Sequence, residues 1–344
     1  MHRAARIFVF KTASDMQQRV LVTGSAGHLG EALMRNLRSA GNEPIGIDLL
    51  ASPFTTHTGS VTDRSFVRRC MKGIQTVFHT ATLHKPHVAT HTNQQFIDTN
   101  ITGTLVLLEE ALAAGVDSFI FTSTTSVFGD ALVPPAGEPA AWITEAVTPV
   151  PKNIYGVTKA AAEDLCQLFY RNQGLPCLVL RTSRFFPEED DHKEMREAYN
   201  DDNLKVNEYL FRRVDIEDAV SAHLAAAQRA RTIGFGKYII SATTPFTPAD
   251  LTALRSDAPA VVQRLIPRYK EAYERLGWSM HPTIDRVYVN ERARTGLGWQ
   301  PRYDFQYLID RIIAGEPTRS ALAQEIGAKG YHKKTFSQGP YPTK

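Results

Sequence analysis

The chain has 344 residues, of which 43% are hydrophobic, enough to bury the core of one large domain or of a large domain with a smaller lobe. Its 39 basic and 36 acidic residues are interspersed and leave a net charge of +3, so we expect neither nucleic acid nor a membrane surface as a partner. The three cysteines lack the spacing of a metal or redox site, and no apolar run is long enough to span a bilayer, which indicates a cytoplasmic protein.

The two ends of the chain are not expected to join the fold. Residues 1–18 are predicted to be a disordered extension, because the apolar patch at residues 7–10 is too short for the core of a secretory signal. The arginines near that patch leave a transit peptide as the alternative. Residues 331–344 are polar, include two prolines and are predicted to form a flexible tail.

The first predicted strand, residues 20–23, leads into a glycine-rich turn and a helix over residues 28–40. Such a turn lets the main chain approach a phosphate closely and lets the helix pack against the strand. The N-terminus of the helix adds free N–H groups and a partial positive charge. The segment therefore predicts a site for the pyrophosphate of a dinucleotide, built by Gly24, Gly27, His28, Leu29 and Gly30.

A second apolar run ends at Asp48, about 20 residues beyond the turn. A carboxylate at this place accepts hydrogen bonds from both hydroxyls of an adenosine ribose and repels a 2′-phosphate, and no Arg or Lys follows it directly. We therefore expect NAD rather than NADP as the cofactor. The alternative is that Asp48 only caps a turn.

Strands and helices continue to alternate with short connections. Strands are predicted at residues 76–81, 119–123 and 177–181, and helices at residues 63–71, 94–114 and 155–172. This order predicts an α/β fold, a doubly wound parallel sheet of the Rossmann type, with an NAD-binding domain over residues 19–182. Residues 183–330 are predicted to form a smaller, mostly helical substrate lobe interleaved with the last strands. Its charged stretch, 188–202, is expected to be a solvated loop or lid helix.

Tyr155 and Lys159 lie four residues apart at the start of a predicted helix, so their side chains share one face. Because an ammonium favours a nearby phenolate, we expect the pKa of Tyr155 to fall from about 10 toward neutral pH. Tyr155 can then act as general base on a hydroxyl or general acid toward a ketone, while Lys159 holds the nicotinamide ribose. The hydroxyls of residues 122–126 either bind the reacting oxygen or have only a structural role at a strand end.

An ordered set of short motifs runs through most of the chain, from Arg19 to about Ala314. It comprises Thr23-Gly24-x-x-Gly27-x-x-Gly30, Asp48, Phe78-His79-x-Ala81, Asn100-x-x-Gly103-Thr104, Thr122-Ser123-Thr124, Tyr155-Gly156-x-x-Lys159, Val214-Asp215-x-x-Asp218-Ala219 and Leu297-Gly298-Trp299-x-Pro301. With these motifs the chain resembles the extended short-chain dehydrogenase/reductase family, in particular its nucleotide-sugar epimerase/dehydratase branch.

The resemblance implies a role for each matching residue. Thr124 is expected to be the catalytic hydroxyl, with Tyr155 as acid/base and Lys159 as its partner. NAD is the implied cofactor, and Thr80, Ala81 and Asn100 are expected beside it. The resemblance also implies a homodimer in which the helices over residues 94–114 and 155–172 pair across a two-fold axis.

The chain departs from the family pattern in residues that bear on the reaction. Dehydratases of the family carry an Asp-Glu pair after the catalytic threonine, where this chain has Thr125 and Ser126, so dehydration is not expected. The family's asparagine shortly after Arg181 is missing, and Tyr209 stands where an arginine usually grips the diphosphate of a nucleotide sugar. These losses favour a smaller sugar or sugar acid.

The residues expected to hold such a substrate are His84, Arg184 and Arg213, although the two arginines can also be ordinary surface residues. His84, His87 and His91 are close in sequence, but no acidic or cysteine ligand is near them and Pro86 interrupts any helix, so no metal site is predicted.

These observations predict an NAD-dependent oxidoreductase or epimerase that acts on a hydroxyl or ketone carbon of a sugar-like substrate. One alternative is a dehydrogenase of a free sugar or sugar acid that releases NADH. The other is a non-catalytic NAD-sensing protein on the same fold.

Overall fold

The computed structural model describes residues 19–330 and Phe336. The extension and the tail predicted at residues 1–18 and 331–344 lie, apart from Phe336, outside the described residues. Within the described part of the chain, no helix is both long and apolar enough to cross a membrane.

A seven-stranded, wholly parallel sheet forms the centre of the molecule, with strand order β3-β2-β1-β4-β5-β7-β8. The strands β2 and β3 are added on one side of β1, and the later strands β4, β5, β7 and β8 are added on its other side. The direction of strand order therefore reverses between β1 and β4. Ligands of doubly wound sheets bind at such a point, beyond the carboxyl ends of the strands. The strands are β1 (Val20–Thr23), β2 (Ile45–Asp48), β3 (His57–Thr58), β4 (Thr76–His79), β5 (Ser118–Thr124), β7 (Cys177–Thr182) and β8 (Phe235–Ile240).

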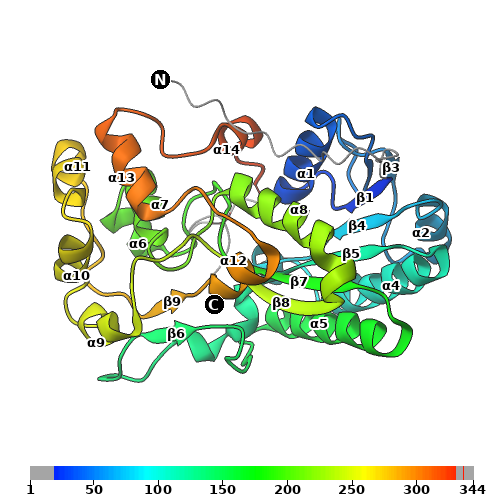
Figure 1. The fold of residues 1–344 in the computed structure, drawn as a ribbon, viewed down its shortest axis with the longest axis horizontal. Coiled ribbons are helices and arrows are strands. Elements are labelled where there is room, and N and C mark those ends of the chain that lie inside the picture. The colour runs from blue at the N-terminus through cyan, green and yellow to red at the C-terminus, as the bar shows by residue number, and fades with distance from the viewer. Residues whose placement is uncertain (1–18, 331–335, 337–344) are drawn as a thin grey trace.

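Helices cover both faces of the sheet (Figure 1). Val20 and Val22 of β1 face one helical layer and Leu21 faces the other, as the two-residue period of a strand requires. One layer contains α1 (His28–Ser39), α8 (Ile216–Ile233), α12 (Glu291–Leu297) and α14 (Ala321–Ile326). The other contains α2 (Arg64–Cys70), α4 (Gly103–Ala114) and α5 (Ile154–Gln173). The predicted fold class, a doubly wound α/β sheet, is confirmed.

A second hydrophobic core lies beside the sheet, at the left of Figure 1. It gathers Ala140 and apolar residues from positions 206–312 and is mostly helical. A small parallel pair, β6 (Ala141–Ile143) with β9 (Arg286–Tyr288), lies next to it. The helices on this side are α6 (Lys193–Ala198), α7 (Asp201–Glu208), α9 (Leu251–Leu254), α10 (Ala258–Leu265), α11 (Tyr269–Leu276) and α13 (Phe305–Ile313).

A buried ion pair joins α5 to the sheet. Both Arg181 nitrogens Nε and Nη2 donate to the carboxylate of Glu163, at 3.0 and 2.7 Å, and the Ser123 hydroxyl donates to it at 2.6 Å. Lys237 lies 3.2 Å from the same carboxylate. Burial would raise the pKa of Glu163, but the Arg181 and Lys237 charges and the Ser123 hydrogen bond lower it. The pair fixes α5, which carries Tyr155 and Lys159, against β5 and β7.

We expect Glu163→Gln to lower the free energy of unfolding by about 3–5 kcal/mol, because it leaves the Arg181 charge buried without its counter-ion. Asp164→Asn is the matched control: Asp164 also lies near Lys237 but its side chain is 75% exposed, so its loss should cost under about 1 kcal/mol. Urea denaturation of the three proteins measures both effects. Equal stability of the two variants would contradict this role of Glu163.

Candidate active site

The glycine turn after β1 has room for a cofactor's phosphates only because it lacks side chains. A Cβ on Gly30 would lie 1.9 Å from the Gly24 carbonyl oxygen, and a Cβ on Gly24, whose φ is +71°, would lie 2.8 Å from the backbone of Ala81. Thr80 and Ala81, just beyond β4, fix this contact by donating to Thr23, from the Thr80 hydroxyl at 2.6 Å and the Ala81 N–H at 3.1 Å. The turn therefore presents bare main chain and the first N–H groups of α1, including those of His28 and Leu29, to a pyrophosphate.

Asp48 lies at the end of β2, next to the same turn. Its Oδ2 atom accepts the Ala26 N–H at 3.0 Å, and its Oδ1 atom accepts the Leu50 N–H at 2.9 Å. The carboxylate thus caps a local turn and also lies against the glycine turn, so the two roles considered for Asp48 are compatible. Together with the glycine cradle, this geometry fits an NAD cofactor with its adenosine ribose at Asp48.

Thr124 and Tyr155 meet at the carboxyl end of the sheet, both almost fully buried. Thr124 is the last residue of β5, and Tyr155 is in the first turn of α5, which Asn153 caps by accepting the Gly156 N–H at 3.1 Å. Burial raises the pKa of Tyr155 to about 12, and the hydrogen bond with Thr124 offsets part of this effect. At neutral pH the phenol therefore keeps its proton.

Lys159 lies one helical turn after Tyr155, also buried. Its Nζ atom donates to the Thr122 carbonyl oxygen at 2.7 Å and lies 3.9 Å from the centre of the Phe121 ring. Burial lowers the pKa of Lys159 to about 7, although the nearby Cys166 and Glu163 raise it. The expectation that Lys159 lowers the pKa of Tyr155 is wrong for this structure, because desolvation dominates both groups and the ammonium points toward the sheet.

Asn100 lies in a π-helical segment, Ile97–Thr102, between α3 (Asn93–Phe96) and α4. Its amide oxygen accepts from the Thr82 hydroxyl and the Leu83 N–H, both at 2.9 Å, and its NH₂ group donates to the Leu83 carbonyl and the Thr158 hydroxyl. The sequence predicted one uninterrupted helix here. The π segment turns Asn100 toward the loop after β4, which it fixes beside α5.

The histidines after β4 pack against an aromatic residue of a distant loop. The His84 ring stacks on Phe186 with centroids 5.4 Å apart, and the His84 backbone N–H donates to the Nδ1 atom of His87 at 3.0 Å. The rings of His87 and His91 are 5.1 Å apart. Within residues 19–330 no group of three or more potential metal ligands comes together.

Arg184 and Arg213, expected to hold substrate, belong to a charge network built on Glu208. Arg184 contacts Glu208 at 3.1 Å and pairs with Asp190, and Arg213 lies 3.4 Å from Glu208. Burial would raise the pKa of Glu208, but the charges of Arg212, Arg184 and Arg213 hold it at about 2. The stretch 188–202 was predicted to be a solvated loop or lid helix, and solvation is wrong for Asp190 and Asp191, which are buried and paired with Arg184.

Four acidic residues of this region were not predicted from the sequence: Glu188, Asp190, Asp191 and Glu208. Their only local signal was the density of charge in a stretch without an apolar face. Their partners are distant in the sequence, such as Lys85, which contacts Asp191 at 2.6 Å.

The lowered pKa of Lys159 predicts a pH-dependent stability. Between a folded pKa of about 7 and the ordinary value of 10.5, the unfolded chain binds more protons at this residue, so its contribution to the unfolding free energy rises with pH. Relative to Lys159→Met, the wild type should therefore gain up to about 2 kcal/mol between pH 7 and pH 9. Urea denaturation at both pH values measures this difference. If the difference in unfolding free energy between wild type and Lys159→Met stays constant or shrinks as the pH rises, burial does not lower the pKa of Lys159.

Comparison with known proteins agrees with this geometry. The model of the NAD dependent epimerase/dehydratase family matches residues 20–240. The uncharacterized protein y4nG of Sinorhizobium fredii is 31% identical over 166 residues, which are 47% of this chain and 39% of that protein. A dTDP-glucose 4,6-dehydratase of Streptomyces antibioticus is 28% identical over 334 residues, 86% of this chain and 91% of that enzyme. The chain thus spans well under half of the first relative and almost all of the second.

Solved structures share the fold. A short-chain dehydrogenase/reductase superfamily protein from Agrobacterium tumefaciens with bound NAD gives a TM-score of 0.61 at 21% identity, covering 90% of this chain and 99% of that one. MoeE5 in complex with UDP-glucose and NAD gives a TM-score of 0.59 at 22% identity, covering 86% and 97%. The chain belongs to the NAD-dependent epimerase/dehydratase family, and its cofactor is NAD.

Proposed function

We propose that this protein is an NAD-dependent oxidoreductase, an epimerase or dehydrogenase, that acts on a carbinol or ketone carbon of a sugar-like substrate. The observation that carries the proposal is the pair of buried hydroxyls, Thr124 and Tyr155, hydrogen-bonded at the carboxyl end of β5. Retention of Tyr155 and Lys159 argues against a non-catalytic NAD-sensing role. The glycine turn and Asp48 supply the cofactor side of the same crevice.

Each side chain has a distinct role in this proposal. NAD, if held by the glycine turn and Asp48, would supply hydride transfer at the reacting carbon, and the accompanying proton would pass between the substrate oxygen and Tyr155. Tyr155, whose pKa is about 12, holds a proton at neutral pH and can donate it to an oxygen on which negative charge develops. Thr124 donates a second hydrogen bond to that oxygen. Lys159, whose pKa is about 7, can gain or lose its charge near neutral pH, one helical turn from Tyr155. We also assign Lys159 to the binding of the nicotinamide ribose.

Dehydration is not part of the proposal, although the Streptomyces antibioticus relative is a dehydratase. The two residues after Thr124 are Thr125 and Ser126, and neither titrates near neutral pH. The Ser126 N–H donates to the Thr124 hydroxyl oxygen at 3.1 Å, so this pair shapes the end of the strand. Loss of water needs a group that gives and a group that takes a proton beyond Tyr155.

For the substrate, the network around Glu208 favours a free sugar or sugar acid over a nucleotide sugar. Arg184 lies two residues beyond Thr182, the residue of β7 that pairs with Thr124, but its guanidinium is paired with Asp190, Asp191 and Glu208. A diphosphate would have to displace buried carboxylates to reach it. His84 is the third residue that we assign to this substrate site, through its stacking beside Phe186.

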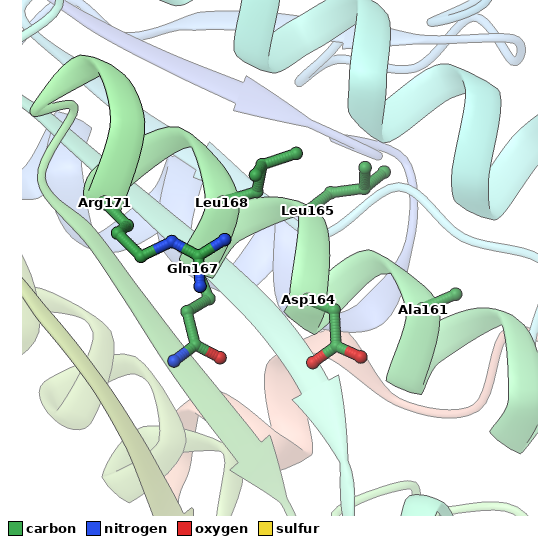
Figure 2. Close-up of a pocket in the computed structure, with 6 residues that line it drawn as sticks. All are labelled: Ala161, Asp164, Leu165, Gln167, Leu168 and Arg171. Atoms are coloured by element: carbon green, nitrogen blue, oxygen red, sulfur yellow. The ribbon is translucent and has the colours of Figure 1, made fainter.

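The proposed assembly is a homodimer formed by α4 and α5. Val157 and Leu112, on these helices, are 48% and 37% exposed. Figure 2 shows the neighbouring hollow, with Ala161, Leu165 and Leu168 following one another along α5. Exposed apolar side chains gathered on two adjacent helices fit a self-complementary two-fold contact. The proposal includes a cytoplasmic location, which the three buried, unpaired cysteines support.

Tyr155→Phe should lower turnover by at least about a hundredfold, because it removes the transferable proton but keeps the ring. Tyr170→Phe, on the exposed side of the same helix, should leave turnover unchanged. NADH formation is followed while free sugars, sugar acids and nucleotide sugars are screened, and epimer formation is followed by chromatography. Near-normal turnover of Tyr155→Phe would contradict the assignment, and turnover confined to nucleotide sugars would contradict the substrate class.

Leu168→Arg should convert the dimer to a monomer, because it places a charge in the apolar contact between the two copies of α5. Leu276→Arg, on α11 and 48% exposed, is the control and should leave the mass unchanged. Sedimentation equilibrium measures the mass of each protein. A wild type that is already monomeric would contradict the proposed assembly.

A further inference from the structure

Three segments that are distant in the sequence converge on one carboxylate, that of Glu188. The His28 Nε2 atom, at the start of α1, lies 2.8 Å from Glu188 Oε1. The Lys329 and Gly330 N–H groups, after α14, donate to the same oxygen at 2.9 and 3.1 Å. Burial alone would raise the pKa of Glu188, but the His28 imidazole and the Lys329 N–H outweigh it and hold it at about 2. Glu188 is therefore an anion at all working pH values.

The side chain of Lys329 reaches the glycine turn itself. Its Nζ atom donates to the Ala26 carbonyl oxygen at 2.7 Å and pairs with Glu31, in the first turn of α1. An unpaired carboxylate at this place would repel a phosphate held by the helix N-terminus. Burial raises the pKa of Glu31, but its contacts with Lys329 and Arg35 outweigh this and lower it. Lys329 thus compensates a charge that otherwise weakens the pyrophosphate site.

The β7–α6 loop, residues 183–192, links this contact to the substrate side. Phe186 lies between them: its ring centre is 5.4 Å from that of His28 and 5.4 Å from that of His84. The Phe186 carbonyl oxygen accepts from Arg213 Nη2 at 2.7 Å, which ties the loop to the Glu208 network. A chain of contacts therefore runs from the substrate side, through Phe186 and Glu188, to the glycine turn.

The C-terminal segment reaches this place because α14 packs against α1 and α8. Figure 1 shows α14, in red-orange, beside the blue α1 at the top of the molecule. Residues 329 and 330 follow α14 closely, so they lie beside the glycine turn and the start of α1.

We propose that Glu188, His28 and Lys329 form a latch that holds the β7–α6 loop and residues 329–330 over the glycine turn and slows the release of NAD. These are positioning residues: they act on the turn and the loop and take no part in proton transfer. The proposal rests on the NAD site assigned above to the glycine turn. It goes beyond the proposed reaction because it concerns how long the cofactor stays bound, and it assigns a role to Glu188 and Lys329, which lie outside the dinucleotide motif.

The test measures NADH release from the intact protein by stopped-flow fluorescence, with excess NAD as the competitor. Glu188→Ala should release NADH at least about tenfold faster than the wild type, because the loss of a charged hydrogen-bond acceptor frees both His28 and the 329–330 segment. Glu189→Ala is the matched control: the adjacent carboxylate is 70% exposed and approaches Arg196 only at 4.0 Å, so release should stay within about twofold of the wild type. Lys329→Gln should also accelerate release and should weaken NAD binding at low salt.

A double-mutant comparison separates the latch from a general loss of structure. If the residues act together, Glu188→Ala with Lys329→Gln should accelerate release by less than the product of the two single effects. Thermal unfolding of each variant, monitored by circular dichroism, verifies that it is folded. If Glu188→Ala does not fold, Glu188→Gln replaces it in the release measurement. Wild-type release rates in both folded Glu188 variants, or purely multiplicative effects, would overturn the latch.

The failure of the latch and that of the underlying NAD site are distinguishable. Gly30→Ala places a methyl group against the Gly24 carbonyl and should abolish NAD binding if the site is at this turn. Loss of binding in Gly30→Ala with unchanged release in Glu188→Ala overturns only the latch. Normal binding in Gly30→Ala overturns the site and with it the proposed function.

Discussion

The close contact between the glycine turn and the end of β4 determines where every other part of the site lies. Gly24 touches the Ala81 backbone, and Gly30 touches Gly24, at distances that no side chain permits. This contact places the N-terminus of α1 at the reversal point of the sheet, between β1 and β4. The loop after β4 is then fixed by Asn100, and α5 by Glu163 and Arg181. The hydroxyls of Thr124 and Tyr155, which we propose to be catalytic, thus depend for their position on the packing of the glycine turn against the end of β4.

Burial controls the chemistry of the site more strongly than the pairing of side chains. Tyr155 and Lys159 share a helix face, yet the phenol is driven toward its protonated form and the ammonium toward its neutral form. Both shifts favour uncharged groups, as expected where two ionisable side chains are desolvated together. In the reaction that we propose, a proton held in such surroundings is available for donation to the substrate oxygen.

The opposite charge arrangement is found around the β7–α6 loop, where buried carboxylates stay ionised: arginines surround Glu208, and the His28 imidazole and the Lys329 N–H contact Glu188. Glu208 and Glu188 both have pKa values held at about 2. Carboxylates of the chain itself therefore neutralise the cationic side chains around the β7–α6 loop. This internal compensation stabilises the loop and, in the substrate site that we propose, leaves less positive charge for a highly charged substrate.

The sequence by itself determined the parts of the protein that depend on near neighbours. Local sequence patterns predicted the glycine turn, Asp48, the long helices and the Tyr155–Lys159 spacing, because backbone freedom and periodicity are local properties. The short strands β6 and β9 were not, since three-residue strands exist only through their distant partners. Only the tertiary structure decided the π segment at Asn100, the direction of the Tyr155 and Lys159 pKa shifts, and the convergence of Glu188, His28 and Lys329. Each of these depends on desolvation or on contacts between residues far apart in the chain, which no local pattern records.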